Sequence, residues 1–325
     1  MTVSESLVSI LIPTFQRAAY LREAIASALR QSYTNIEVVI LDDCSPDATP
    51  SVAKEFDIDV RVRYLRNERN LGIAGNWRVG FEHVRGEYFC ILHDDDWLEE
   101  EFVARLLQPL RSDASLILSF CDQWVIDAYG HRQPEKSARA SSGYRRDTLP
   151  EGRLEDFVSS VLIDNSVPAG AAMFRSQLVT SAFLNERARG SSDMWLLYNC
   201  VRSGAAAYFV KERLINYRQH DGGMTVSMPF EVIEGHIFRY TAYVSEPSLA
   251  RYHEHFREQL AEAHEWLGMA LLRSSRYQEA QASFGEAIKR RTSLKAVIGT
   301  LLGACGTCGR LSLAWTDEIR RVLCR

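Results

Sequence analysis

Segments of strand character alternate with segments of helix character along the N-terminal part of the chain, and this alternation constrains the fold more than any other feature. The segments expected as strands are residues 8–13, 36–41, 60–65 and 88–92, and those expected as helices are residues 18–32, 49–56 and 74–84. Such a repeat predicts a parallel sheet with helices packed on its faces. Because open sheets bind ligands beyond the carboxyl ends of their strands, we expect the binding site at the polar turns 13–15, 42–43 and 93–96.

Three consecutive carboxylates, Asp94 to Asp96, follow the last of these strands. Carboxylates repel one another at a strand end, so a cation or another partner has to satisfy them. Asp94 and Asp96 project to the same side of an extended segment, and their hard oxygen atoms suit Mg²⁺ or Mn²⁺. A second interpretation remains open, because residues 97–107 have a helical pattern and acidic residues also favour the first turn of a helix.

The composition is that of a globular protein. The 325 residues are 46% hydrophobic and 25% charged, which allows one large core or two domains. A formal net charge of -4 and an isoelectric point near 6.1 give no reason to expect nucleic acid as a partner. Seven scattered cysteines favour a reducing compartment over a disulfide framework. Without a visible signal peptide or an apolar run of roughly 18 to 20 residues, we expect a cytoplasmic protein.

Neither of the common glycine-rich phosphate loops, G-x-G-x-x-G or G-x-x-x-x-G-K-[ST], occurs in the chain. Their absence argues against an ordinary Rossmann dehydrogenase and against a P-loop enzyme. Carboxylates stand where glycines would be expected. They fit a nucleotide whose phosphates are bridged by a metal ion and whose base and ribose donate hydrogen bonds to acidic side chains.

Five spaced motifs together resemble a family 2 glycosyltransferase of the GT-A fold. The motifs are residues 9–15, 41–47, 69–76, 86–88 and 94–97. The resemblance covers about residues 7–227 and implies an α/β fold with a Rossmann-like mixed sheet flanked by helices. We expect a glycosyltransferase domain over residues 1–227, with the half that binds the sugar donor at 7–97 and the acceptor half at 98–227.

The same resemblance implies an activity. Members of this kind are inverting enzymes that use a nucleotide-activated sugar and a divalent metal, here Mn²⁺ or Mg²⁺. A UDP-sugar is the first expectation, with dTDP- and GDP-sugars not excluded. A saccharide, lipid-linked or protein acceptor is expected, in bacterial surface polysaccharide or glycoconjugate assembly.

The resemblance also assigns roles to individual residues. Those expected to bind the sugar donor are Pro13, Thr14, Phe15, Arg17, Asp43, Arg69, Asn70, Gly72, Asn76, Asp94, Asp95, Arg218 and Thr225. The expected metal ligands are Asp96, Asp94 and His220, and the division of roles among the three aspartates stays open. Structural roles compete at some positions: a solvated Arg17, a simple turn over residues 70–72, and a surface turn at His220. Asp47 is expected to cap a helix.

Asp193 is the expected catalytic base. Direct displacement at the anomeric carbon needs a group that takes the proton of the acceptor hydroxyl, and Asp193 resembles the acid of the family motif at a helix start. Many relatives have an acidic pair two positions earlier, where this chain has Gly190 and Ser191. A helix-capping role for Asp193, with Ser192 as the rival cap, is the alternative.

Residues 125–152 are polar, rich in Arg, Ser and Gly, and without periodicity, which predicts a mobile loop near the acceptor. The basic residues of this segment are Arg132, Lys136, Arg139, Arg145 and Arg146. They could meet an anionic acceptor, but solvated side chains are the favoured interpretation.

Residues 228–325 predict an all-helical C-terminal extension. Apolar residues between 267 and 287 have the spacing of one tetratricopeptide-like helix pair. A single pair cannot bury its own apolar face, so we expect it to pack on preceding helices at 230–244 and 249–260, or on a partner protein.

The apolar tail, residues 294–313, could rest on the inner face of a membrane or on a neighbouring subunit. The lone motif Cys305 to Cys308 within it does not predict a zinc site, because no second pair of ligands is near.

Two other functions remain open. A sugar-phosphate nucleotidyltransferase would bind metal and nucleotide on a similar sheet, but it should carry a glycine-rich basic loop after the first strand. A non-catalytic scaffold built around the C-terminal helices would bind a nucleotide-sugar without turnover.

Overall fold

The computed structural model describes residues 5–220, 230–291 and 293–307. They form two compact units. The first comprises residues 1–186 and 192–226, and the second comprises residues 187–191 and 227–325, within the described parts of each. Among the described residues, no helix is both long enough and apolar enough to cross a membrane.

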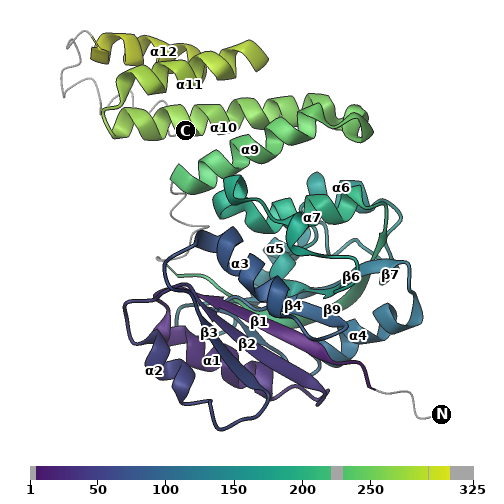
Figure 1. The fold of residues 1–325 in the computed structure, drawn as a ribbon. Helices are drawn as coiled ribbons and strands as arrows, with labels where there is room; N and C mark the ends of the chain where they lie inside the picture. Colours follow the sequence, from purple (N-terminus) through teal and green to yellow (C-terminus); the bar gives the residue numbers. More distant parts are fainter. Residues whose placement is uncertain (1–4, 221–229, 292, 308–325) are drawn as a thin grey trace. The chain divides into compact units, whose positions relative to one another are not determined.

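A nine-stranded mixed sheet forms the centre of the first unit (Figure 1). Its strands are β1 Val8–Thr14, β2 Ile36–Asp42, β3 Val62–Arg66, β4 Tyr88–Ile91, β5 Trp97–Leu98, β6 Leu116–Ile126, β7 Gly152–Arg153, β8 Ala172–Arg175 and β9 Ala206–Arg218. They lie in the order β3-β2-β1-β4-β8-β6-β9-β5, with β7 paired to β9. The strands β1 to β4 are parallel, whereas β8 runs antiparallel between β4 and β6. The predicted mixed α/β sheet is confirmed.

Helices cover both faces of this sheet. They are α1 Ala18–Leu29, α2 Thr49–Lys54, α3 Gly72–His83, α4 Phe102–Ser112, α5 Pro134–Gly143, α6 Phe157–Leu162 and α7 Ser192–Arg202. Successive strand residues point to opposite faces, so Ile10 and Ile12 of β1 join the core that contains α1 and α4. Leu11 and Leu41 lie on the other face, under α3. A methyl group at Gly80 would overlap the Leu41 side chain, so the glycine permits α3 to approach the sheet closely.

The helix predicted for residues 97–107 is wrong at its start. Residues Trp97–Leu98 form β5, which pairs with β9, and the amide of Glu99 donates to the carbonyl of Leu214 at 2.9 Å. Helix α4 begins only at Phe102. The strand predicted from residue 60 likewise begins at Val62, because Val60 is 98% exposed and the chain turns at Asp59. The acidic cluster therefore does not lie in the first turn of a helix, which removes the capping interpretation.

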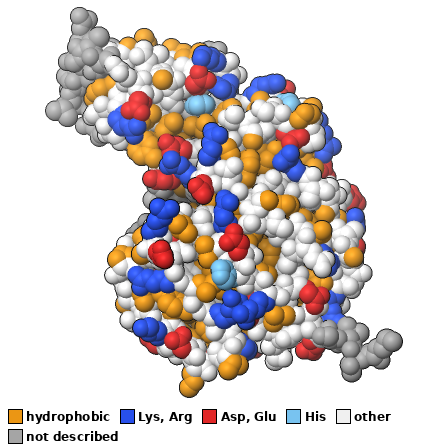
Figure 2. Space-filling model, in the orientation of Figure 1, with side chains coloured by type: hydrophobic (Ala, Val, Ile, Leu, Met, Phe, Trp, Pro, Cys, Tyr) orange, Lys and Arg blue, Asp and Glu red, His pale blue; other side chains and the backbone are white. Residues whose placement is uncertain are grey.

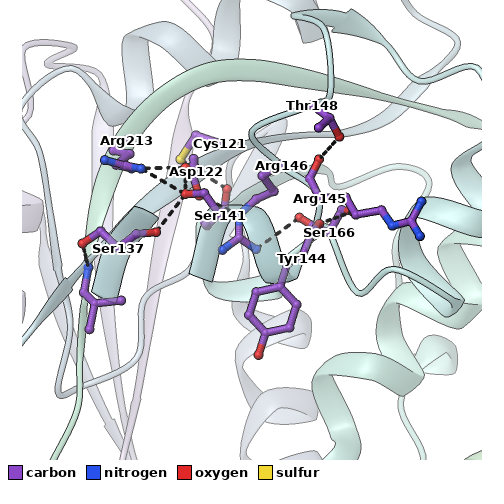
Figure 3. A network of polar contacts seen from close by, with 12 residues as sticks. Cys121, Asp122, Ser137, Ser141, Tyr144, Arg145, Arg146, Thr148, Ser166 and Arg213 are labelled. Atoms are coloured by element: carbon purple, nitrogen blue, oxygen red, sulfur yellow. Dashed lines mark hydrogen bonds and ion pairs between the residues drawn. The ribbon is translucent and has the colours of Figure 1, made fainter. Parts of the chain in front are cut away.

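The prediction of a loop over residues 125–152 is wrong for residues 134–143, which form the helix α5, anchored to the sheet by a buried polar network (Figure 3). Asp122 of β6 accepts a hydrogen bond from Arg146 Nε at 2.6 Å and one from Arg213 Nε at 3.2 Å, from either side. The hydroxyl of Ser141, on α5, also donates to Asp122. Arg146 is only 2% exposed. It is therefore a structural residue and not one of a set of solvated basic side chains.

The other four basic residues of this segment remain at the surface. Lys136 is exposed, and Arg139 forms an exposed ion pair with Glu135. Arg145 pairs with Asp164 at 3.2 Å, and Arg132 pairs with Glu99. On the face shown in Figure 2, basic and acidic side chains also lie among one another. Exposed pairs of this kind contribute little to stability.

We expect Asp122→Asn to destabilise the protein by about 3 kcal/mol, because it leaves the buried guanidinium of Arg146 without its charge partner. The change in the free energy of unfolding is measured by urea denaturation. Glu55→Gln is the control, because Glu55 pairs with Arg22 at the surface, and its loss should cost less than about 1 kcal/mol. Equal effects of the two substitutions would contradict a stabilising role for the network.

The second unit is helical, as predicted. Its helices are α9 Phe230–Ser245, α10 His253–Arg273, α11 Tyr277–Arg290 and α12 Leu294–Thr307. The tetratricopeptide-like pair corresponds to α10 and α11. The two helices approach closely at Gly268 of α10, where an added methyl group would lie 2.7 Å from the Phe284 ring of α11. The pair packs on α9 through rings such as Tyr243 and Phe256, 5.1 Å apart, and on α12. The helix predicted for residues 249–260 begins later than expected, because residues 247–252 form a 3-10 helix before α10. Cys308 and the end of the apolar tail lie outside the described residues.

Candidate active site

The three polar turns meet at the carboxyl edge of the parallel strands, as the sequence predicts. Thr14 and Asp42 are register partners on β1 and β2, and the amide of Asp43 donates to the Thr14 carbonyl at 3.0 Å. Asp94, which follows β4, faces the Thr14 side chain, whose hydroxyl helps to stabilise the aspartate charge. The Thr14 hydroxyl is buried and makes no hydrogen bond of ordinary geometry within the described residues.

Asp94 and Asp96 are buried carboxylates. They are 9% and 2% exposed. Burial, followed by repulsion from Asp95, raises the pKa of Asp94 to about 7, and burial also raises the pKa of Asp96. An acidic pair held in this way favours a bound cation.

Asp95 forms a cluster with Arg17 and His220. Its Oδ2 lies 3.1 Å from Arg17 Nη1 and 3.1 Å from His220 Nε2, and these two nitrogens are 2.8 Å apart. The three side chains come from the end of β1, the end of β4 and the end of β9. A cavity of about 490 Å³ lies here, lined partly by Arg17, Tyr20, Asp47 and His220. Arg17 is therefore not simply solvated.

Arg218 has its guanidinium engaged by protein groups. It donates to the carbonyl of Asp95 at 2.7 Å and to Glu23, while its backbone amide donates to Asp96 Oδ1 at 2.8 Å. The guanidinium lies over the rings of Tyr20 and Trp97, at 4.6 and 5.3 Å. Arg218, 3% exposed, therefore orients the aspartate turn, and a direct contact with a diphosphate would require it to give up one of these partners.

Asp43 organises the loop at residues 67–72. Its carboxylate accepts from the amides of Leu71 and Gly72, at 2.8 and 2.9 Å, and from Asn67 Nδ2 at 2.9 Å. Gly72 has a φ of +72°, which favours glycine. The amide of Gly72 also donates to Asn70 Oδ1 at 3.0 Å, so the turn interpretation describes this segment well.

Asn76 and Asp47 have structural contacts as well. Asn76, 4% exposed, donates to the Leu41 carbonyl at 2.9 Å. Asp47 accepts from the first amides of two helices, at Thr49 and Ala18, and these hydrogen bonds outweigh burial and lower its pKa. The expected capping role of Asp47 is what the structure shows.

Two other residues that were expected to bind the sugar donor, Phe15 and Arg69, are exposed. Phe15 is 40% exposed at the end of β1, and Arg69 lines a cavity of about 270 Å³ together with Asn70, Arg78 and Glu186. Thr225 lies outside the described residues.

Asp193 lies in the first turn of α7, half-buried, and close enough to His93 to affect its charge. Although burial opposes the charged form, the carboxylates of Asp96, Asp95 and Asp193 raise the pKa of His93. The His93 ring stacks on Trp77, with centroids 6.4 Å apart, and a methyl at Gly170 would come within 3.3 Å of it. The Nδ1 atom of His93 lies 3.7 Å from Asp96 Oδ2, so His93 pairs with the acidic cluster. In the sequence His93 belongs to the polar turn 93–96, and no pattern there singles it out.

The donor atoms present fit a magnesium or manganese ion that shares its coordination with a substrate. Within the described parts of the chain, no three His, Cys, Asp or Glu side chains converge as a complete ligand set. Mg²⁺ usually takes one or two protein carboxylates and completes its shell with water and phosphate oxygens, so Asp94 and Asp96 meet that requirement. His220 Nε2 is already in contact with Arg17 and Asp95, which makes it the least suitable of the expected ligands.

The sequence model of Glycosyl transferase family 2 matches residues 9–177, more than half of the chain. The chain therefore belongs to this family. It is 27% identical over 220 residues to an uncharacterized glycosyltransferase, RT0329, of Rickettsia typhi, covering 67% of the chain and 66% of that protein. It is also 26% identical over 219 residues to the putative teichuronic acid biosynthesis glycosyltransferase TuaG of Bacillus subtilis, covering 67% and 81%. The chain spans less than two thirds of several relatives, and only 15% of GlyA of Streptococcus pneumoniae.

Two solved structures share the fold. The S. aureus TarS fragment 1–349, in complex with UDP-GlcNAc, superposes with a TM-score of 0.65 at 14% identity, covering 93% of this chain and 92% of the fragment. The mannosyltransferase PcManGT of Pyrobaculum calidifontis, in complex with GDP-Man and Mn²⁺, superposes with a TM-score of 0.58 at 16% identity, covering 97% and 84%. At these identities the likeness establishes the fold alone.

Proposed function

We propose that this protein is a metal-dependent inverting glycosyltransferase that moves a sugar from a nucleotide-sugar, a UDP-sugar first, to a hydroxyl acceptor. The observation that carries the proposal is the buried pair Asp94 and Asp96 at the carboxyl edge of β4. This pair lies beside the Thr14 and Asp43 turns in a chain of the glycosyltransferase family. Asp43 keeps the 67–72 loop in place, and Arg69 is exposed where it can meet a phosphate.

Asp94 and Asp96 would hold the divalent cation, with Arg218 fixing the backbone of their turn. When bound, the cation would neutralise the charge that develops on the departing nucleoside diphosphate. Asp95, between Asp94 and Asp96 in the chain, pairs with Arg17 and His220. These two ion pairs would hold the turn of residues 94–96 in place.

Asp193 would act as the general base. It would take the proton of the acceptor hydroxyl while the new bond forms between that oxygen and the anomeric carbon and the bond to the diphosphate breaks. A single displacement of this kind inverts the configuration. His93, whose Nδ1 lies 3.7 Å from Asp96 Oδ2, would offset part of the negative charge of that carboxylate.

A UDP-sugar is preferred because TarS, which shares the fold, binds UDP-GlcNAc, while GDP-Man in PcManGT keeps other nucleotides open. The name of TuaG supports a role in surface polysaccharide synthesis, with a saccharide, lipid-linked or protein acceptor. We propose a cytoplasmic location, with the C-terminal helices available for a peripheral membrane or protein contact.

The function is tested by a thermal-shift screen of UDP-, dTDP- and GDP-sugars, each with MnCl₂ and with EDTA. A sugar donor at 100 times its Kd should stabilise the protein by about 2.7 kcal/mol, a shift of several degrees, and only in the presence of metal. The nucleotide-sugar that binds is then assayed for hydrolysis and transfer. No stabilisation by any nucleotide-sugar would contradict the proposal, and binding without turnover would favour the non-catalytic alternative.

A further inference from the structure

A cavity with two arginines lies beside the start of α3. It has a volume of about 270 Å³ and is here called the arginine cavity. Residues 69–71, residues of the first turns of α3, among them Arg78, and Glu186 line it, and all of them belong to the first unit. Two guanidinium groups face one carboxylate, so the lining carries an excess of positive charge.

The charge of Arg78 is poorly matched by its surroundings. Among the described residues it pairs only with Glu186, whose Oε1 lies 3.9 Å from Arg78 Nη2, beyond hydrogen-bond distance. The two side chains are 41% and 75% exposed, and an exposed contact of this kind contributes little. A phosphate or carboxylate group binds a guanidinium more strongly, because it accepts two parallel hydrogen bonds. Glu186 is therefore a carboxylate that such a ligand can displace.

Arg69 is the second cation of the cavity. Its side chain is exposed, and within the part of the chain that the structure describes it has no ion pair. The turn that carries it is nevertheless fixed, since the amides of Leu71 and Gly72 both donate to Asp43. A methyl group at Gly75 would lie 2.7 Å from Leu71 Cβ, so this turn also packs closely on α3. An ordered wall reduces the entropy that binding costs.

The arginine cavity joins the two halves of the glycosyltransferase domain. Arg69 and Arg78 come from the half expected to bind the sugar donor, whereas Glu186 comes from the acceptor half. The 3-10 helix Ser181–Phe183 packs on α3 and also on α7, the helix that carries Asp193. The cavity is thus connected to the element with the expected catalytic base, while the Asp94 and Asp96 pair lies at the end of β4.

We propose that the arginine cavity binds a negatively charged group, a phosphate or a carboxylate, that is carried by the acceptor of the transfer reaction. Arg78 and Arg69 would then select a charged saccharide acceptor over a neutral one. This inference rests on the proposed function and deepens it, because it names the chemical class of the acceptor.

The first test titrates inorganic phosphate into the protein in the presence of EDTA, by isothermal titration calorimetry. Arg78→Gln should weaken phosphate binding by about 10-fold, because one charge-assisted contact is lost. Glu186→Gln should strengthen it by about threefold, because a competing carboxylate is removed. Arg22→Gln is the matched control, since Arg22 forms an exposed pair with Glu55 and does not line the cavity. It should leave phosphate binding unchanged.

The second test identifies the molecule that carries the charge. The phosphate titration is repeated with saturating nucleotide-sugar and MnCl₂, and the Kd of phosphate should stay within about twofold if the cavity is separate from the diphosphate site. In transfer assays, phosphate should inhibit competitively against the acceptor. Arg78→Gln should raise the KM of an anionic acceptor by about 10-fold and change kcat by less than about twofold.

The inference is overturned if wild-type protein does not bind phosphate, or if Arg78→Gln and Glu186→Gln bind it as the wild type does. Loss of phosphate binding when the nucleotide-sugar is present would assign the cavity to the diphosphate of the sugar donor. Inhibition that does not compete with the acceptor would assign it to free phosphate, and both results contradict the proposal. Failure of every nucleotide-sugar to bind would instead refute the proposed function, whatever the phosphate titration shows.

Discussion

Replacing Asp96 with Asn should reduce sugar transfer by about 10³-fold, which corresponds to about 4 kcal/mol of lost transition-state stabilisation. Asn keeps an oxygen that can accept the hydrogen bond from the amide of Arg218, so the turn should stay in place while the charge is lost. The affinity for the nucleotide-sugar measured with MnCl₂ should fall to the value measured with EDTA. Transfer rates and isothermal titration calorimetry provide both quantities.

Asp59→Asn is the matched control for this substitution. Asp59 pairs with Arg61 at 2.8 Å on the far side of the parallel strands and takes no part in the candidate site. Its loss should leave transfer and metal dependence unchanged. An Asp96→Asn protein that retains metal-stimulated binding and turnover would exclude Asp96 as a ligand.

Replacing Asp193 with Asn should lower kcat by about 10² to 10⁴-fold, because the acceptor hydroxyl loses its general base. The Kd of the sugar donor should change by less than about twofold, since Asp193 is not expected to contact the nucleotide. Steady-state rates at saturating acceptor, combined with a binding titration, separate the two effects.

A helix-capping role predicts a different result. If Asp193 only caps α7, the Asn variant should lose little stability and keep its rate, because Asn caps helices about as well as Asp does. Asp57→Asn, at an exposed position, is the control for the loss of one negative charge. Unchanged transfer by the Asp193 variant would remove this residue from the mechanism.

The parallel half of the fold could be predicted from the sequence because its strands are continuous apolar runs separated by amphipathic helices. The order of β8, β6 and β9 could not, because their pairing depends on contacts between distant segments. Helix α5 was missed for a clearer physical reason. Its buried face consists of Ser137 and Ser141, small polar residues four positions apart, so a search for apolar periodicity does not detect it.

The location of the site could likewise be predicted, since the ends of parallel strands meet at one edge. The partners of each charged group could not. Glu23 reaches Arg218 across 195 positions, and Asp122 reaches Arg146 across 24. These pairings explain why Arg218 orients a turn and why Arg146 is buried. The sequence around each arginine, taken without its distant partner, favours a surface or phosphate-binding role.

The most direct measurement is the anomalous scattering of manganese in a crystal grown with MnCl₂ and the nucleotide-sugar identified by the thermal screen. We predict a single strong peak about 2.1 Å from a carboxylate oxygen of Asp96 or Asp94 and in contact with the diphosphate of the ligand. A bound nucleotide-sugar with no peak at these carboxylates would contradict the role assigned to them.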